Sequence, residues 1–74
     1  MEDFLMASAE TIKRIRLKMG LTQTKFGEKF GVTRGAICNF EKGRGKPSLE
    51  IIIKILKIAR NNKIKANIDE FSGN

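Results

Sequence analysis

The sequence predicts an all-α fold, a compact bundle of four to five short helices. Three residues that favour helix N-caps, Thr22, Thr33 and Ser48, stand directly before segments whose apolar residues recur at helical spacing. Two of these segments are followed by Gly31 and Gly43, and glycine readily adopts the left-handed conformation that ends a helix. The 74 residues contain no internal repeat and no interdomain linker, and a chain of this length forms one domain.

The first helix is predicted at residues 9–19. Ser8 is a plausible N-cap for it, and Gly20 follows as its stop. Residues 1–7 are either an N-terminal arm or an extension of this helix, and the sequence leaves both open. In either case residues 8–74 are expected to form the single domain.

Two further helices, at residues 23–30 and 34–42, are separated by a tight turn that contains Gly31. Two short helices joined in this way indicate a helix-turn-helix. Gly27 falls where the two helices are expected to cross closely, so only a very small residue should fit at that position.

The helix at 34–42 has two unlike faces. At about 100° per residue, Ile37 and Phe40 lie on one side, and no large apolar residue lies on the other. The outer side consists of Arg34, Gly35, Cys38, Asn39 and Lys42. A guanidinium, a carboxamide and an ammonium beside small residues are suited to base edges and phosphates in a DNA major groove. A solvated helix face is the alternative, so this face favours DNA only together with the turn and the charge distribution.

Charge is unevenly distributed along the chain, whose formal net charge is +7. Residues 12–46 contain ten Lys and Arg against two Glu, while the rest of the chain contains five against six acidic residues. A basic region beside a near-neutral remainder indicates a polyanion bound on one side. General solubility is the alternative reading of this basic charge.

The span from residue 12 to residue 59 resembles the helix-turn-helix family of lambda repressor and Cro, also called the Xre family. The matching residues are Ile12, Ile15, Arg16, Ile37 and the segments 21–23 (LTQ), 30–33 (FGVT), 41–43 (EKG) and 46–50 (KPSLE). The resemblance implies a lambda repressor-like bundle and a sequence-specific regulator of transcription, expected to be a repressor, that binds double-stranded DNA. The chain departs from the family at Gly27, where alanine is usual, and at Lys42, where asparagine is frequent.

In this family the recognition helix, here the predicted helix at 34–42, lies in the major groove. The resemblance therefore implies roles for individual residues of this chain. Base contacts are expected from Arg34, Gly35, Cys38 and Asn39, with Arg34 on guanine and Asn39 on adenine. These positions vary within the family, so the resemblance does not indicate the sequence that is read. Phosphate contacts are expected from Gln23, Lys25, Thr33, Lys42, Arg44 and Lys46. For Gln23, a solvated residue in the first turn of its helix is the alternative.

The resemblance also implies a structural ion pair between Arg16 and Glu41. A guanidinium can hold a carboxylate through two parallel hydrogen bonds, which would tie the first helix to the third. A phosphate contact by Arg16 is the functional alternative.

The fourth helix, predicted at residues 49–60, has more apolar surface than one core can use. Its apolar residues sweep roughly 220° of the helical wheel, where a single-sided helix needs about 100°. A short fifth helix is expected at 68–71. We expect the excess surface to form a homodimer interface made by Ile51, Ile58, Ile64, Ile68 and Phe71, where Ile51 and Ile58 lie at the edge of the apolar arc furthest from Leu49 and Ile53. The competing account is that the tail folds back over this helix within one chain.

Composition excludes several classes of protein. The chain has no histidine and a single cysteine, Cys38, so an enzyme, a metal site, a cofactor and an intramolecular disulfide are not expected. No apolar run is long enough to span a bilayer, and the acidic N-terminus is unlike a signal peptide, so we expect a reducing, cytoplasmic setting without membrane contact. An antitoxin or another protein-interaction module built on the same helical domain is the alternative function.

Overall fold

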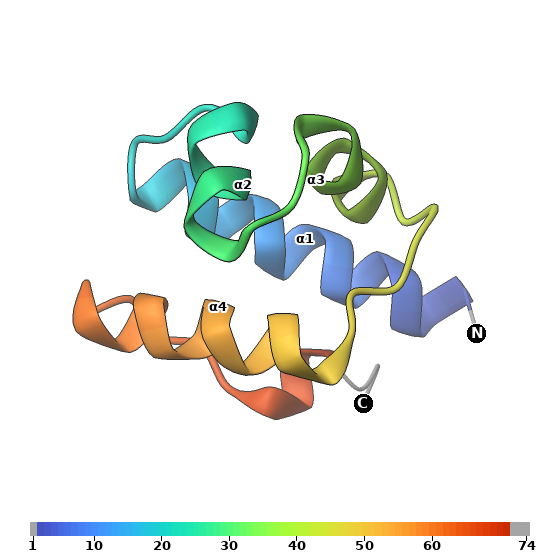
Figure 1. The fold of residues 1–74 in the computed structure, drawn as a ribbon. Coiled ribbons are helices and arrows are strands. Elements are labelled where there is room, and N and C mark those ends of the chain that lie inside the picture. The colour runs from blue at the N-terminus through green and yellow to red at the C-terminus, as the bar shows by residue number, and fades with distance from the viewer. Residues whose placement is uncertain (1, 72–74) are drawn as a thin grey trace.

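The computed structural model describes the backbone of residues 2–71 and the side chains from Ser8 to Phe71. The helices are α1 (Glu2–Lys18), α2 (Gln23–Phe30), α3 (Arg34–Glu41), α4 (Leu49–Asn61) and the 3-10 helix η1 (Ile68–Phe71). No strand occurs among the described residues, which confirms the predicted all-α bundle. In Figure 1, α2 and α3 lie on one side of α1 and α4 lies on the other.

Helix α1 begins earlier than the cap residue predicted. It starts at Glu2, so residues 2–7 belong to the helix, and Ser8 is an interior residue rather than an N-cap. Ser8 is 2% exposed and its hydroxyl has no hydrogen-bond partner among the described residues. Residues 2–19 contain no proline or glycine that would interrupt a helix, and the burial of Ser8 beside Ala9 outweighs its capping preference.

The other predicted caps are present. The hydroxyl oxygens of Thr22, Thr33 and Ser48 accept hydrogen bonds from backbone N–H groups three residues later, at 3.1, 3.1 and 3.2 Å. Helix α3 ends one residue before the expected position, with Lys42 as its C-cap and Gly43 in the left-handed conformation. These local hydrogen bonds explain why the helix-turn-helix segment could be predicted from the sequence.

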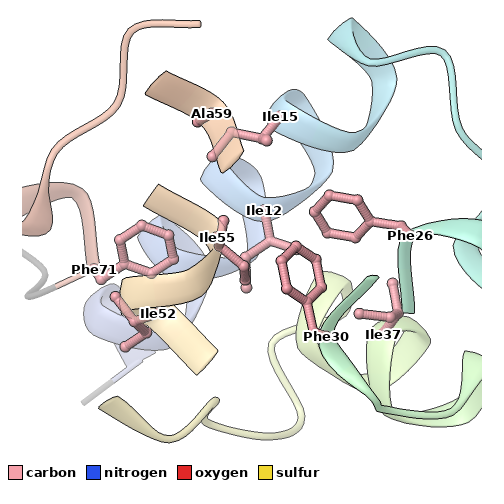
Figure 2. Packing of buried hydrophobic residues seen from close by; sticks show 9 residues of the cluster. All are labelled: Ile12, Ile15, Phe26, Phe30, Ile37, Ile52, Ile55, Ala59 and Phe71. Atoms are coloured by element: carbon pink, nitrogen blue, oxygen red, sulfur yellow. The ribbon is translucent and has the colours of Figure 1, made fainter. Parts of the chain in front are cut away.

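One core joins all the helices. Figure 2 shows its members, which are Ile12, Ile15, Phe26, Phe30, Ile37, Ile52, Ile55, Ala59 and Phe71. The rings of Phe26 and Phe30 meet edge to face, with centroids 4.8 Å apart. Phe71 belongs to the core and is 2% exposed, so the tail folds back within the chain and the prediction that Phe71 forms a dimer contact is wrong.

Gly27 lies at the closest approach of α2 to the turn that follows it. A Cβ atom at Gly27 would lie 2.6 Å from the backbone oxygen of Val32, whereas a Cβ at Gly35 would meet only the Thr33 hydroxyl at 3.7 Å. We expect Gly27→Ala to lower the free energy of unfolding by about 1–2 kcal/mol, because the turn must open. Gly35→Ala is the matched control and should raise it by up to about 1 kcal/mol through helix propensity. Urea denaturation measures both, and a Gly27→Ala protein more stable than wild type would contradict the close approach.

Candidate nucleic-acid interface

Burial divides α3 into an inner and an outer face. Ile37 is fully buried and Phe40 is half-buried, whereas Arg34, Gly35 and Asn39 are exposed. Cys38, also predicted to lie near DNA bases, is half-buried and carries a free thiol. The core therefore holds α3 by its apolar side and leaves a guanidinium and a carboxamide open to a ligand.

Residues predicted to contact phosphates lie at both ends of this outer face. At the start of α3, the Thr33 hydroxyl accepts the Ala36 N–H and can still donate its own proton to a phosphate oxygen. At the other end, Lys42 and Arg44 are exposed. The Arg44 N–H donates to the Asn39 carbonyl at 2.9 Å, which fixes the loop close to α3.

Gly45 and Lys46 complete this loop. A Cβ at Gly45 would meet the Phe40 ring at 3.7 Å, so the loop packs directly on α3. Lys46 is exposed but also interacts within the chain. Lys25, predicted as another phosphate contact, is exposed on α2, where its ammonium lies 3.9 Å from the Glu28 carboxylate. An exposed pair of this kind is weak, so the Lys25 ammonium can exchange Glu28 for a phosphate.

The Arg16–Glu41 pair is present and joins α1 to α3. Arg16 Nε and Nη2 donate to the two Glu41 carboxylate oxygens at 2.6 and 3.1 Å, and Arg16 Nη1 donates to the Leu21 carbonyl at 2.9 Å. The side chains are 12% and 5% exposed. Because three of its five N–H groups donate to Glu41 and Leu21, Arg16 ties α1 to α3 and to the turn before α2.

The ion pair with Glu41 raises the pKa of Arg16. The hydrogen bond to Glu41 raises the pKa of Arg16 above its ordinary value, the Glu41 charge adds to that rise, and partial burial opposes it. The guanidinium therefore stays protonated under all physiological conditions. The buried carboxylate of Glu41 always faces a positive charge.

Gln23 joins the same cluster, which the sequence did not indicate. Its amide donates to Glu41 Oε1 at 3.2 Å, and the side chain is half-buried. The second amide hydrogen and the amide oxygen of Gln23 are not engaged in this bond. The predicted phosphate contact would therefore use a side chain that Glu41 already orients.

The sequence model of the Helix-turn-helix family matches residues 12–60, which cover α2, α3, nearly all of α4 and the C-terminal part of α1. The chain belongs to the helix-turn-helix family. Membership of this family of regulators implies DNA binding, and the matched span contains the two helices, their turn and the buried ion pair described above. No solved structure matches the chain significantly.

Several proteins of similar sequence are named as regulators. Over 46 residues, 62% of this chain and 70% of the relative, it is 44% identical to the uncharacterized HTH-type transcriptional regulator YgzD of Bacillus subtilis. Over 47 residues, 64% of this chain and 67% of the relative, it is 40% identical to an HTH-type transcriptional regulator of Archaeoglobus fulgidus. An HTH-type transcriptional regulatory protein of Pyrococcus furiosus is 31% identical over 74% of this chain, which covers only 18% of that relative's length.

A second ion pair in this helix-turn-helix protein has no signal in the sequence. Arg14 Nη2 donates to a Glu70 carboxylate oxygen, which also accepts the Thr11 hydroxyl, and Arg14 Nη1 donates to the Lys65 carbonyl at 3.0 Å. The partners lie 56 residues apart. Arg14 therefore holds the tail on α1.

The exposed edge of α4 is not the predicted one. Ile51, Ile58 and Ile64 are half-buried against the core. The exposed large apolar residues of α4 and η1 are Leu49, Ile53 and Ile68, at 63%, 51% and 50%. The face of α4 that meets the core carries Ile52, Ile55 and Ala59, and this orientation of the helix leaves Leu49 and Ile53 exposed.

This exposed edge adjoins an open hollow of about 460 Å³. The hollow is lined by Lys46, Pro47, Ser48, Leu49, Ile52, Ile68 and Phe71. Apolar side chains and a concave surface side by side offer area for a partner. Over the described part of the helix-turn-helix protein, no group of three metal-ligating side chains occurs, and no helix is long and apolar enough to cross a bilayer.

Proposed function

We propose that this helix-turn-helix protein is a sequence-specific regulator of transcription, a repressor, that reads the major groove of double-stranded DNA with α3. The observation that carries the proposal is the exposure of Arg34 and Asn39 on a helix whose other side is buried through Ile37. A side chain held by a rigid helix discriminates bases better than one on a mobile loop.

The side chains proposed to contact DNA fall into two sets, those that bind bases and those that bind phosphates. Arg34 can bind guanine O6 and N7 with two hydrogen bonds, and Asn39 can pair with adenine N6 and N7. Gly35 and the half-buried Cys38 allow α3 to approach the groove floor closely. Phosphate contacts by Gln23, Lys25, Thr33, Lys42, Arg44 and Lys46 would position the helix without reading sequence.

The two roles predict different mutational signatures. Arg44→Ala should weaken binding to all duplexes alike and make the slope of log affinity against log salt shallower by about one per subunit. Arg34→Ala should instead relax the preference at one base pair per half-site, with a loss of about 1–3 kcal/mol of discrimination. Selection of bound duplexes from a random library, repeated for both variants, measures these effects. An unchanged preferred sequence for Arg34→Ala would refute the base-reading role.

We further propose that the protein acts as a homodimer on an inverted-repeat operator. The apolar edge formed by Leu49, Ile53 and Ile68, together with the adjoining hollow, supports this assembly. Ile51, Ile58 and Ile64 are half-buried against the core and would contribute only their exposed parts. A twofold dimer would present two copies of α3 about 34 Å apart, one turn of the duplex.

Disrupting the apolar edge should separate assembly from folding. Ile53→Asp is expected to produce monomers and to lower the affinity for an inverted repeat at least tenfold, because burial of a carboxylate at an interface is unfavourable. Its affinity for a single half-site should remain. Leu17→Asp is the matched control, since Leu17 is 57% exposed on α1 outside this edge. Sedimentation at micromolar concentration reports the mass, and a monomeric wild type with full affinity for a half-site would refute the dimer.

A further inference from the structure

A second group of cations lies at the end of α4 and in the loop that follows. We call Lys57, Arg60, Lys63 and Lys65 the α4 basic patch. All four residues are exposed, and no acidic residue occurs in the sequence between Glu50 and Asp69. Among the described residues, none of these four side chains has a salt-bridge partner. The patch therefore carries a positive charge that the chain itself does not neutralise.

The acidic side chains nearest in sequence are engaged elsewhere. The Glu50 carboxylate lies 3.3 Å from the Lys54 ammonium, one helical turn away. Glu70 binds Arg14, and Asp69 also interacts within the chain. The three acidic residues nearest to the patch in sequence, Glu50, Asp69 and Glu70, are thus engaged within the chain, whereas the four cations remain exposed.

Three of the four cations of the patch line a concave surface. An open hollow of about 460 Å³ is lined by Arg60, Lys63, Ile64, Lys65, Ala66 and Asn67. Three cations and one carboxamide at a hollow of this size match a backbone phosphate and its neighbours. The only large apolar side chain in the lining, Ile64, is half-buried against the core.

The backbone at the patch is fixed. The Ile64 N–H donates to the Ala59 carbonyl at 2.8 Å, and Arg14 binds the Lys65 carbonyl at 3.0 Å. Lys63 has a φ of 59°, a left-handed conformation in which glycine would be less strained. The chain thus carries an ammonium at a position where stability alone would favour glycine.

The patch is remote from the DNA-reading helix. In Figure 1, α3 and the C-terminal end of α4 lie on opposite sides of α1. A duplex seated on the outer face of α3 would therefore leave the patch open on the other side of the molecule.

We propose that the α4 basic patch binds the sugar-phosphate backbone of a second DNA segment, so that the protein bridges two stretches of duplex. This inference rests on the proposed DNA binding by α3. An acidic protein segment is the competing partner. DNA fits better because the patch offers cations without an exposed apolar or aromatic anchor, and protein interfaces depend on such anchors whereas phosphate contacts do not.

The test compares two charge-matched double variants of the full chain. Lys57→Gln/Arg60→Gln removes two charges from the patch. Lys13→Gln/Lys29→Gln removes two exposed cations, also without salt-bridge partners among the described residues, from α1 and α2. Capture of a free labelled duplex by a bead-bound duplex measures bridging, and binding of one short duplex measures the α3 interface.

The patch variant should lose bridging at least tenfold while its short-duplex affinity changes less than twofold, and the control variant should retain both. Unchanged bridging would overturn the proposal, as would an equal loss of both activities, which would place the patch in the α3 interface. Patch-dependent binding of a poly-glutamate peptide without bridging would assign the patch to an acidic protein.

Two further variants separate this proposal from the proposed function. In Arg34→Ala/Arg44→Ala, binding through α3 is weakened, and the remaining duplex binding at low salt should fall at least tenfold when Lys57→Gln/Arg60→Gln is added. Failure of the wild type to bind a short duplex refutes DNA reading by α3. Equal affinities of the double and the quadruple variant refute DNA binding by the α4 basic patch.

Discussion

Replacing Glu41 with alanine is expected to leave the protein largely unfolded at room temperature. Arg16 would lose two of its hydrogen bonds and remain as an uncompensated charge that is 12% exposed, which in a buried pair costs about 3–5 kcal/mol. The Gln23 amide would lose its acceptor as well. A small domain has only about 5 kcal/mol of stability to lose. Circular dichroism during urea and thermal denaturation measures the loss.

Three further variants test whether the loss of stability in Glu41→Ala comes from the broken Arg16–Glu41 pair. Glu28→Ala and Glu50→Ala each remove an acid from an exposed pair and should leave the melting temperature nearly unchanged. Arg16→Met/Glu41→Leu should recover much of the stability, because apolar side chains of similar volume avoid the unpaired charge. A Glu41→Ala protein that melts like Glu28→Ala would show that the pair does not stabilise the fold.

The pair should also resist changes of pH. Since the pKa of Arg16 is raised in the folded state, its contribution is fully present below the ordinary arginine pKa and is lost only as the pH rises past the folded value. Both values lie far above neutral pH. The difference in stability between wild type and Arg16→Met/Glu41→Leu should therefore contain no arginine titration between pH 7 and about pH 9.

Phe71→Ala should have an effect of similar size. The ring is 2% exposed and packs in the core with residues of α1 and α4, and deletion of such a ring costs about 3–5 kcal/mol. Ile68→Ala is the matched control in the same short helix, because Ile68 is 50% exposed and its truncation should change stability little. Urea denaturation compares them. Equal midpoints for the two variants would show that η1 contributes nothing to the fold.

The loss of Phe71 should also release the tail. With the ring gone, the Arg14–Glu70 pair, which is partly exposed, would be the main remaining contact holding η1 on α1. We expect faster proteolysis after residue 61 in Phe71→Ala than in Ile68→Ala, measured under conditions in which both proteins are folded. Cleavage at equal rates would indicate that the tail is held elsewhere.

The sequence by itself determined the features that depend on near neighbours. Thr22, Thr33 and Ser48 each accept an N–H three residues later, and Gly31 and Gly43 end their segments with a left-handed backbone. A hydrogen bond between residues so close in sequence forms wherever the local chain turns, so its donors and acceptors can be identified without the rest of the fold. The same applies to the outer face of α3, which follows from helical periodicity. Arg16–Glu41 was predicted only through the family resemblance.

Only the tertiary structure decided which surface of each element meets the core. Ser8 lies inside α1, Phe71 is buried, and Leu49 and Ile53 rather than Ile51 and Ile58 are exposed. On α4, apolar residues sweep so wide an arc that several rotations of the helix would bury a similar area. The choice among them depends on the space left by Ile12, Ile15 and Phe30. Arg14–Glu70 forms only because the tail returns to α1, and the gain from closing such a loop depends on contacts more than fifty residues apart.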